Sequence, residues 1–389
     1  MRVALNIEQL LQRPSGGIGR YTAELMRLLP TVGGADIDDP IEVVPFVARH
    51  RRAAVATALG GFGLPDDDVV RLWLPRPVLY DTWNLAGFPP LGTLHSDLRN
   101  IDLVHAPSLA IPPRSGVPLI VTVHDAAALV FPDTYTRRGR WFHARGSAAA
   151  ARRADLVIAP THAAAEEVSE HTKIPLDRMR VVPHGVAQHV VGEGVVEATR
   201  RTLGLGDEPF VLWVGTLEPR KNLPVLVEAF RAVLAAGDLP HKLVLVGPTG
   251  WLDAADTVRH LAEQLGDRVC LTGSVRADRL VALYRGADVL AFPSLHEGFG
   301  LPVLEAMSQS TSVLCSDIAV LREVGGDAAH YVQADDPVAW GDALVDLLRD
   351  EGAREDLATR GHAHAANFTW ERCAERTRAV YRDVVAGND

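Results

Sequence analysis

Short apolar runs rich in β-branched residues alternate with helix-compatible segments along this sequence, and this alternation is its strongest constraint on the fold. Strands that alternate with helices form parallel sheets, and strands covered on both faces are apolar throughout. Segments such as Gly19–Leu29 and Ala163–Glu170 have the composition of the intervening helices. The strands predicted in the first part of the chain are Val3–Ile7, Ile41–Val47, Leu103–Ala106, Leu119–Val123, Leu156–Ala159 and Arg180–Val182.

The same pattern starts again after Pro183-His184-Gly185 and a glycine-containing stretch with one short helix. Its predicted strands are Phe210–Val214, Leu243–Val246, Val269–Thr272, Val289–Phe292 and Ser312–Leu314. A chain of 389 residues also exceeds what one hydrophobic core supports, about 250 to 300 residues. We therefore expect an α/β protein with two doubly wound, Rossmann-like domains that face a central cleft. The expected domains are residues 1–185 and 186–370, with residues 371–389 forming a helix that packs back on the first domain.

Charge and composition exclude several classes of function. Lys and Arg number 39 against 49 Asp and Glu, so the net charge of −10 argues against binding nucleic acid, whose phosphates require a basic surface. The three cysteines are far apart and fit neither a disulfide framework nor a common zinc site. The N-terminus lacks the apolar core of a signal peptide, and no apolar run is long enough to span a membrane. The expected location is the cytoplasm.

The most informative stretch runs from Phe292 to Met307 and holds two carboxylates, Glu297 and Glu305. An apolar strand ends near Phe292, and Pro302 is typical of the first turn of a helix. Gly298, Phe299 and Gly300 therefore form a strand-to-helix loop whose backbone N–H groups can approach an anion or a hydroxyl group. The alternative is a purely structural role, in which the glutamates complement the helix dipole and the glycines form turns. It explains each of these residues alone but not their combination in one segment.

Glu-Gly-Phe-Gly-Leu-Pro followed by Leu-Glu-Ala resembles the E-x7-E motif of glycosyltransferase family 4, a family of retaining enzymes with the two-domain GT-B architecture. The resemblance extends over residues 1 to 382 and is densest between 211 and 334. It implies that Glu297 is catalytic and stabilises the transferred sugar, that Glu305 binds the ribose, and that the backbone at Gly298–Gly300 contacts the sugar.

A second motif, Gly-Thr-Leu-Glu-Pro-Arg-Lys-Asn from Gly215 to Asn222, resembles the family's basic loop. The resemblance implies that Arg220 and Lys221 bind the donor diphosphate, where cations offset the charge that the leaving group gains. A solvated Arg-Lys pair is the alternative. Many family members carry a further Arg immediately after the glycine, whereas this chain has Thr216, so the diphosphate site depends more on Arg220 and Lys221.

Three further segments resemble the family at the corresponding places. His124 ends a predicted strand and would contact the transferred sugar as a second catalytic residue; a histidine bonded within the core is the alternative. The glycine loop with Gly16 and Gly17 would close over the diphosphate, although a tight turn before a helix explains it equally well. Ser274 and Val275 would hold the nucleoside base.

No bound metal and no cofactor are expected, because Arg220, Lys221 and a helix dipole can stabilise the leaving group. Asp36-Ile-Asp38 and Asp66-Asp-Asp68 have the D-x-D form that metal-dependent glycosyltransferases of another fold use. Both pairs lie in predicted loops, so we interpret them as solvated acids.

A basic helix is predicted over Arg137–Arg153, with six arginines, no acidic residue, and Trp141 beside Phe142. Such local basicity in an acidic protein favours peripheral contact with anionic lipid or with a lipid diphosphate acceptor at the inner face of the plasma membrane. A solvated helix face that pairs with acidic residues elsewhere is the alternative.

The expected activity is transfer of a hexose from a nucleoside diphosphate sugar to a hydroxyl acceptor in glycan, polysaccharide or glycolipid synthesis. The basic loop is similar to that of bacterial mannosyl- and rhamnosyltransferases of surface polysaccharides, so GDP-mannose is the first expected donor. UDP-glucose or a UDP-N-acetylhexosamine is the second. An NDP-sugar epimerase and a non-catalytic nucleotide-sugar-binding subunit remain alternatives. The sequence leaves the acceptor, the linkage and the oligomeric state open.

Overall fold

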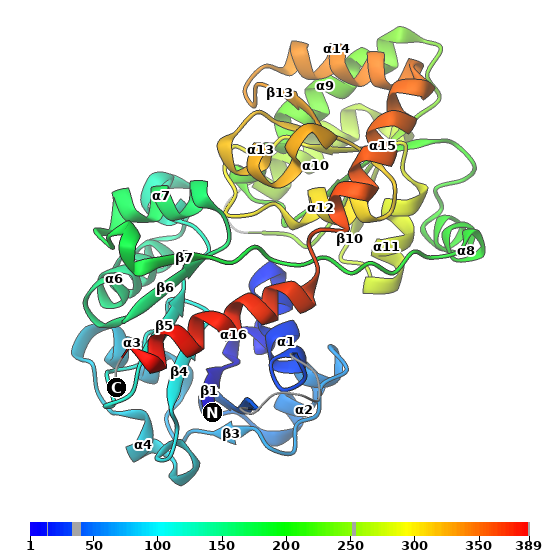
Figure 1. Ribbon diagram of the computed structural model, residues 1–389. Coiled ribbons are helices and arrows are strands. Elements are labelled where there is room, and N and C mark those ends of the chain that lie inside the picture. The colour runs from blue at the N-terminus through cyan, green and yellow to red at the C-terminus, as the bar shows by residue number, and fades with distance from the viewer. Residues whose placement is uncertain (14, 33–39, 251–253, 388–389) are drawn as a thin grey trace. The chain divides into compact units, whose positions relative to one another are not determined.

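The computed structural model describes residues 1–13, 15–32, 40–250 and 254–387, and it divides into two compact units (Figure 1). Unit 1 comprises Met1–Val130, Arg137–Gly185 and Trp370–Asp389. Unit 2 comprises Phe131–Thr136 and Val186–Thr369. The sequence had placed residues 131–136 in the first domain, but this short segment clusters with unit 2. Asp36 and Asp38, the two aspartates of the first D-x-D pattern, lie outside the described residues.

Unit 1 is built on a parallel sheet with the strand order β3-β2-β1-β4-β5-β6-β7 among its described residues. The central strands are almost entirely apolar and buried because helices cover both faces of a parallel sheet. The strands are β1 (Arg2–Asn6), β2 (Glu42–Val47), β3 (Val70–Arg71), β4 (Leu103–Ala106), β5 (Leu119–Thr122), β6 (Leu156–Ala159) and β7 (Met179–Val181).

The helices of unit 1 connect these strands, and the last one comes from the C-terminal segment of the chain. They are α1 (Gly16–Leu28), α2 (Arg52–Gly60), α3 (Arg76–Ala86), α4 (Leu91–Leu94), α5 (Ala127–Val130), α6 (Arg137–Arg153), α7 (His162–Thr172) and α16 (Trp370–Ala386). Short 3₁₀ helices are η1 (Glu8–Leu11), η2 (Ser96–Leu98), η3 (Pro132–Thr134, within unit 2) and η4 (Leu176–Arg178). Helix α16 packs against α1.

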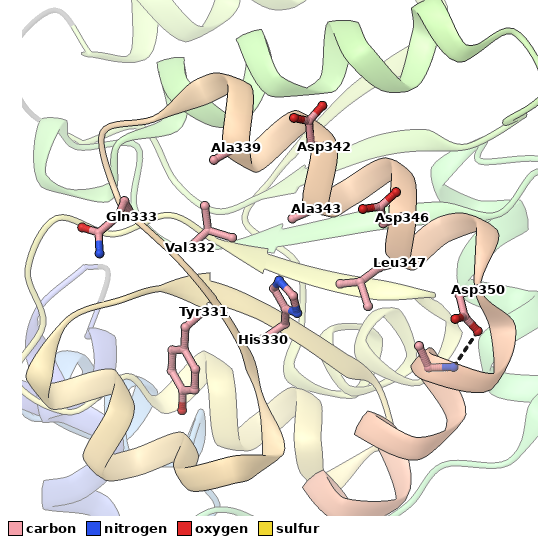
Figure 2. A pocket seen from close by; sticks show the side chains of 11 residues that line it. His330, Tyr331, Val332, Gln333, Ala339, Asp342, Ala343, Asp346, Leu347 and Asp350 are labelled. Atoms are coloured by element: carbon pink, nitrogen blue, oxygen red, sulfur yellow. Dashed lines mark hydrogen bonds between the residues drawn. The ribbon is translucent and has the colours of Figure 1, made fainter.

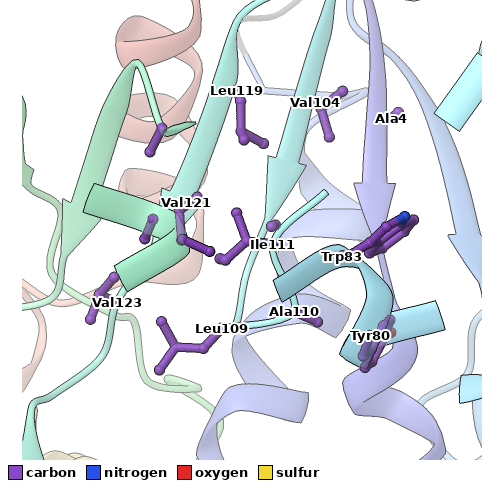
Figure 3. Close-up of a cluster of buried hydrophobic side chains, with 14 of the residues drawn as sticks. Ala4, Tyr80, Trp83, Val104, Leu109, Ala110, Ile111, Leu119, Val121 and Val123 are labelled. Atoms are coloured by element: carbon purple, nitrogen blue, oxygen red, sulfur yellow. The ribbon is translucent and has the colours of Figure 1, made fainter. Parts of the chain in front are cut away.

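The core of unit 1 contains the inner face of α3. Figure 3 shows Tyr80 and Trp83 of this helix beside Ala4 of β1, with Val104 and Val121 on the neighbouring strands. The rings of Tyr80 and Trp83 are stacked with centroids 5.7 Å apart, and the Trp83 indole N–H donates to the Pro89 carbonyl at 3.0 Å. Buried aromatic rings contribute large apolar areas, and a buried indole needs such a partner. These contacts fix which face of α3 points away from the sheet.

Unit 2 is built on a second parallel sheet, with the order β10-β9-β8-β11-β12-β13 in the part of the chain that the structure describes. Its central strand, β8, is buried at every residue, as its apolar sequence requires. The strands are β8 (Phe210–Val214), β9 (Lys242–Val246), β10 (Val269–Gly273), β11 (Val289–Phe292), β12 (Ser312–Ser316) and β13 (His330–Val332).

The helices of unit 2 cover both faces of its sheet, with separate apolar clusters around Trp213 and around Phe292. They are α8 (Glu193–Leu203), α9 (Leu223–Ala236), α10 (Ala254–Gln264), α11 (Ala277–Gly286), α12 (Leu301–Ser308), α13 (Ala319–Gly325), α14 (Pro337–Arg349) and α15 (Glu351–Ala365). Short 3₁₀ helices are η5 (Pro219–Lys221), η6 (Gly266–Arg268) and η7 (Gly326–Ala328). Helices α9 and α14 pack against each other.

The predicted strands are all present, and the structure adds two that the sequence did not indicate, β3 and β13. Both have two or three residues and pair on one side only, at a sheet edge. Such short edge strands carry too few residues for a periodic pattern. Among the described residues, no helix combines the length and the apolar character needed to cross a bilayer.

Candidate active site

Two loops meet at the carboxyl edge of the sheet in unit 2. One follows β8 and the other follows β11, and these strands are paired neighbours. The backbone N–H of Leu295 donates to the carbonyl of Arg220 at 2.9 Å, which ties the two loops together. In open α/β sheets, ligands bind beyond the carboxyl ends of the strands. Both motifs singled out in the sequence therefore lie at the edge where a ligand is expected.

Glu297 lies between two cations from the other loop. The Lys221 ammonium donates to Glu297 Oε1 at 2.5 Å, and the Arg220 guanidinium donates to Glu297 Oε2 at 3.3 Å. Arg220 also donates to the carbonyl of His296 at 2.5 Å. Glu297 and Lys221 are buried. The predicted sugar-binding carboxylate and the predicted diphosphate-binding cations thus form one ion cluster.

The cluster has a fourth member that the sequence reasoning missed. Glu218 is buried and accepts a hydrogen bond from Arg220 Nη2 at 2.7 Å. Two carboxylates therefore balance two cations, and Glu218 fixes the direction of the guanidinium plane. Glu218 lies two residues before Arg220, but only the structure shows that the two side chains meet.

The pKa of Glu297 reflects a competition between burial and charge. Burial by itself would raise the pKa of this carboxyl group, but the attraction of Lys221 and Arg220 outweighs the burial. The hydrogen bond from Lys221 acts in the same direction, and the pKa falls to about 2. Glu297 is therefore a carboxylate at neutral pH.

The loop after Glu297 turns sharply into α12. Gly300, the residue before this helix, has a φ of 95°, and a Cβ there would lie 2.6 Å from Leu321 Cδ2. Only glycine fits this position, for both reasons. Gly298 and Phe299 are also buried, and the ring of Phe299 lies 6.2 Å from that of Phe368. The predicted backbone site at Gly298–Gly300 is thus a constrained turn at a helix N-terminus.

Glu305 lies one turn into α12 and is held by a tyrosine from α11. The Tyr284 hydroxyl donates to Glu305 Oε2 at 2.8 Å. Tyr284 is buried, and this burial, with the neighbouring Glu305 charge, raises the pKa of the Tyr284 hydroxyl well above its ordinary value. Tyr284 therefore stays protonated and donates a hydrogen bond that orients the predicted ribose-binding carboxylate; the sequence did not indicate this residue.

Ser274 and Val275, the predicted base-binding residues, follow the edge strand β10. Ser274 is exposed and Val275 is half-buried. Because the sheet is parallel, their loop lies at the same edge as Glu297 but is separated from β11 by β9 and β8. Ser274 and Val275 thus share the carboxyl edge of the sheet with the ion cluster but follow a strand that is two positions away from β8.

The loop after β9 is held against the loop after β8 by a close backbone contact. A Cβ on Gly247 would lie 1.7 Å from the Gly215 carbonyl oxygen, and the φ of Gly247 is 148°. Leu217 and Thr249 add a backbone bridge between the loops. Gly247 is a further residue that the sequence reasoning missed, and it supports the loop that carries Arg220 and Lys221.

His124 belongs to unit 1 and lies two residues after β5. Its Nε2 is 3.0 Å from the carbonyl oxygen of Pro107, so Nε2 carries the proton and donates. Its Nδ1 is 3.2 Å from His184 Nε2, and a neutral His124 must accept there. Both ring nitrogens of the predicted catalytic histidine are therefore engaged inside unit 1.

His124 and His184 are part of a buried polar cluster with Tyr21. The Tyr21 ring lies 5.3 Å from that of His124 and 4.7 Å from that of His184. Burial lowers the pKa of His124, and burial together with the His124 charge lowers the pKa of His184 well below its ordinary value. A third histidine, His105, has its pKa lowered to about 3, mainly by burial. All three are neutral at physiological pH.

Gly16 and Gly17 form the exposed start of α1 in unit 1, and Gly16 has a φ of 60°. Tyr21, which contacts His124, lies one turn further along the same helix. The predicted site residues therefore fall into two groups. Unit 2 holds the ion cluster with Glu305, Ser274 and Val275, and unit 1 holds His124, Gly16 and Gly17.

No group of three or more histidine, cysteine, aspartate or glutamate side chains that could hold a metal ion occurs within the described ranges. Of the D-x-D patterns, Asp66-Asp-Asp68 lies before β3. Asp67 lies 3.4 Å from the exposed Arg52 guanidinium, and Asp66 lies 3.9 Å from it. These acids form ordinary surface ion pairs.

A groove of about 590 Å³ lies elsewhere in unit 2, between β13 and α14. Figure 2 shows Val332, Ala343 and Leu347 on its apolar side and Asp342 and Asp346 along α14. None of the predicted site residues lines this groove. It is separate from the ion cluster.

The model described as "Glycosyltransferase Family 4" matches residues 15–188, and the model described as "Glycosyl transferases group 1" matches residues 208–350. D-inositol 3-phosphate glycosyltransferase of Salinispora tropica is 30% identical, over 96% of this chain and 82% of that protein. The chain belongs to glycosyltransferase family 4.

Other relatives of this family 4 glycosyltransferase agree with the assignment. O-antigen chain mannosyltransferase B of Escherichia coli is 28% identical over 386 residues, which cover 96% of this chain and 97% of that protein. The crystal structure of HepE from Anabaena, in complex with UDP and glucose, matches with a TM-score of 0.74 and 18% identity, over 98% of this chain and all of that one. The GT-B fold that the resemblance implied is confirmed, and the chain is an enzyme of the glycosyltransferase type.

The depressed pKa of Glu297 predicts how pH affects stability. A pKa lowered from 4.5 to about 2 stabilises the folded state above about pH 4.5, and this contribution is lost as the pH falls towards 2. Glu297→Gln should therefore lower the free energy of unfolding by about 3 kcal/mol near neutral pH, and the difference from wild type should narrow at about pH 3. Denaturant titrations at both pH values test this, with the exposed Glu355→Gln as control. A difference that is equal at both values would contradict the role of the Glu297 charge.

The buried histidines of unit 1 make a second prediction. Because folding lowers the pKa values of His105, His124 and His184, the unfolded state binds more protons below about pH 6.5, and stability falls as the pH falls. The melting temperature of His184→Asn should decline less steeply between about pH 7.5 and about pH 5.5, since one such group is removed. The exposed His260→Asn should keep the wild-type slope, because its environment is aqueous in both states. Equal slopes for wild type and His184→Asn would refute this account.

Proposed function

We propose that this family 4 enzyme is a retaining hexosyltransferase that uses a nucleoside diphosphate sugar, with GDP-mannose as the first candidate, and a hydroxyl acceptor in glycan, polysaccharide or glycolipid synthesis. The observation that carries the proposal is the buried Glu297 carboxylate held between Lys221 and Arg220 at the carboxyl edge of the sheet. This arrangement supplies two cations and one anion within hydrogen-bonding distance of each other. Transfer from a diphosphate sugar requires positive charge beside the departing diphosphate and negative charge beside the sugar.

The cations suit a departing diphosphate. As the glycosidic bond breaks, negative charge accumulates on the diphosphate oxygens, and fixed N–H donors in a buried site stabilise it strongly. Lys221 and Arg220 form ion pairs with Glu297 and Glu218. A bound diphosphate would compete for the same donors and would leave Glu297 less tightly paired.

The carboxylate suits the sugar. Glycosyl transfer passes through a state with oxocarbenium character, which a nearby anion stabilises. The pKa of Glu297, about 2, keeps it ionised for that purpose. Glu305, oriented by Tyr284, would accept hydrogen bonds from the ribose hydroxyls. Retention of configuration, the base-binding role of Ser274 and Val275, and the donor contacts of His124, Gly16 and Gly17 are supported by the family resemblance.

Mannose is proposed first because a full-length relative is named a mannosyltransferase. Other relatives are named D-inositol 3-phosphate glycosyltransferases, and the HepE structure holds UDP and glucose, so a UDP-sugar is the second candidate. A panel of GDP- and UDP-sugars, compared by the rise in melting temperature, tests the donor. Release of free nucleoside diphosphate that depends on added acceptor separates a transferase from an epimerase and from a non-catalytic binding subunit.

Substitution of the two glutamates should separate catalysis from nucleotide binding. Glu297→Ala should nearly abolish transfer and leave nucleotide affinity within a few fold, because its proposed partner is the sugar. Glu305→Ala should weaken nucleotide binding by roughly 10 to 150 fold, since it removes a hydrogen bond to a charged group. Calorimetry with the nucleoside diphosphate measures the nucleotide affinity of the two variants. Glu355→Ala, on the exposed face of α15, is the control. Equal losses of affinity in the two variants would contradict these roles.

Turnover should be largely insensitive to EDTA. The reason is that Lys221 and Arg220 supply the positive charge that a divalent ion supplies in metal-dependent transferases. Steady-state transfer is measured before and after chelation, and again after adding Mn²⁺. Activity that disappears with EDTA and returns with Mn²⁺ would overturn the metal-independent mechanism.

A further inference from the structure

Exposed apolar side chains are concentrated in one segment of unit 1. The described residues include nine exposed large hydrophobic side chains, and four of them, Trp73, Val78, Leu85 and Phe88, fall between residues 73 and 88. Trp73 is 59% exposed and Phe88 is 64% exposed. Single exposed apolar residues are common on proteins, whereas a group of them marks an interaction surface.

These four residues, here called the apolar stripe, lie on α3 or within three residues of its ends. Leu79, Tyr80 and Trp83 bury the inner side of this helix. Val78 and Leu85 are seven residues apart, two helical turns, so they lie on the same outer face. Trp73 precedes the helix and Phe88 follows it. The stripe therefore extends over the length of α3.

A row of arginines on α6 borders the apolar stripe. Arg138, Arg145 and Arg152 are spaced by seven residues and all are exposed, so they lie on one face of α6. Arg138 donates to both carboxylate oxygens of Asp81 at 2.5 and 2.7 Å. Asp81 is three residues after Val78 and four before Leu85, on the outer side of α3. This ion pair places the arginine row, defined by these three residues, beside the stripe.

Not all of the arginines of α6 contribute to this surface. Arg153 donates to the carbonyls of Trp83 and Ile111, at 2.5 and 3.4 Å, and so anchors the end of α3. The sequence indicated a basic surface over the whole of Arg137–Arg153. The structure shows that Arg153 is used inside unit 1, and it adds an apolar component from α3, which the sequence did not indicate.

We propose that the apolar stripe and the arginine row together form a docking surface for an anionic lipid bilayer. Tryptophan and phenylalanine side chains insert at the boundary between headgroups and acyl chains, and arginines beside them attract anionic headgroups. Arg145 and Arg152 add exposed positive charge to this face of a protein whose net charge is −10, whereas the charge of Arg138 is balanced by Asp81. The contact is with the membrane surface, through side chains at the outer face of α3.

Vesicle co-sedimentation of the full chain tests the proposal. Wild type should bind vesicles of phosphatidylcholine mixed with phosphatidylglycerol more tightly than vesicles of phosphatidylcholine alone, and added salt should reduce the difference. The double variant Trp73→Ser, Phe88→Ser should bind both kinds of vesicle at least roughly tenfold more weakly than wild type, because it lacks the inserting rings. The assay contains no nucleotide sugar, so its outcome does not depend on the donor or on transfer.

Matched variants separate the two components. Arg145→Glu with Arg152→Glu should remove the preference for anionic vesicles but keep the weaker binding to phosphatidylcholine. Leu176→Ser is the control, since Leu176 is 52% exposed in the same unit but lies on η4. All variants change exposed side chains, and unchanged melting temperatures would verify their folding.

Three results would overturn the proposal. The first is that wild type binds neither kind of vesicle. The second is that the Trp73→Ser, Phe88→Ser variant binds as tightly as wild type, which would leave the stripe without a role. The third is that wild type self-associates in sedimentation velocity without vesicles and the double variant does not. That result would identify the stripe as a contact between copies of the chain.

Discussion

The candidate site depends on the parallel pairing of β8 with β11. Because these strands are neighbours in register, the loops at their carboxyl ends meet, and Glu297 enters the space between Lys221 and Arg220. A buried carboxylate without these partners would be costly, and buried cations without it equally so. The ion cluster therefore stabilises the loops in which it lies, while it presents the charges that glycosyl transfer from a diphosphate donor requires.

The surrounding residues make this arrangement rigid. Gly247 permits the loop after β9 to touch the backbone of the loop after β8, and Gly300 permits the abrupt entry into α12. Tyr284 orients Glu305 through one hydrogen bond, and Glu218 orients Arg220 through another. These residues contact the functional groups and not, in our proposal, the reacting atoms. Rigid support of this kind is what lets a few side chains keep a productive geometry.

Unit 1 combines a buried polar cluster with an exposed amphipathic surface. His105, His124 and His184 are kept neutral by burial, and hydrogen bonds fix their orientation, whereas α3 and α6 expose apolar and cationic side chains side by side. Helix α3 links the core to the surface, since Trp83 packs inside and Val78 and Leu85 point outward. A bilayer contact at this face would bring the enzyme to acceptors that carry a lipid.

The sequence by itself determined the two α/β series, most of the strands, and the identity of Glu297, Glu305, Arg220 and Lys221 as site candidates, because apolar periodicity and contiguous motifs are local properties of the chain. The tertiary structure decided which of these residues meet, since β8 and β11 are separated in sequence by α9, β9, α10, β10 and α11 but are adjacent in the sheet. It also decided the roles of Tyr284 and His184, whose partners are distant in sequence, and the hydrogen bond between Glu218 and Arg220, and it exposed the apolar side chains of α3. Whether an apolar side chain faces the core or the solvent is settled by the elements that pack against its helix, and that information is not local.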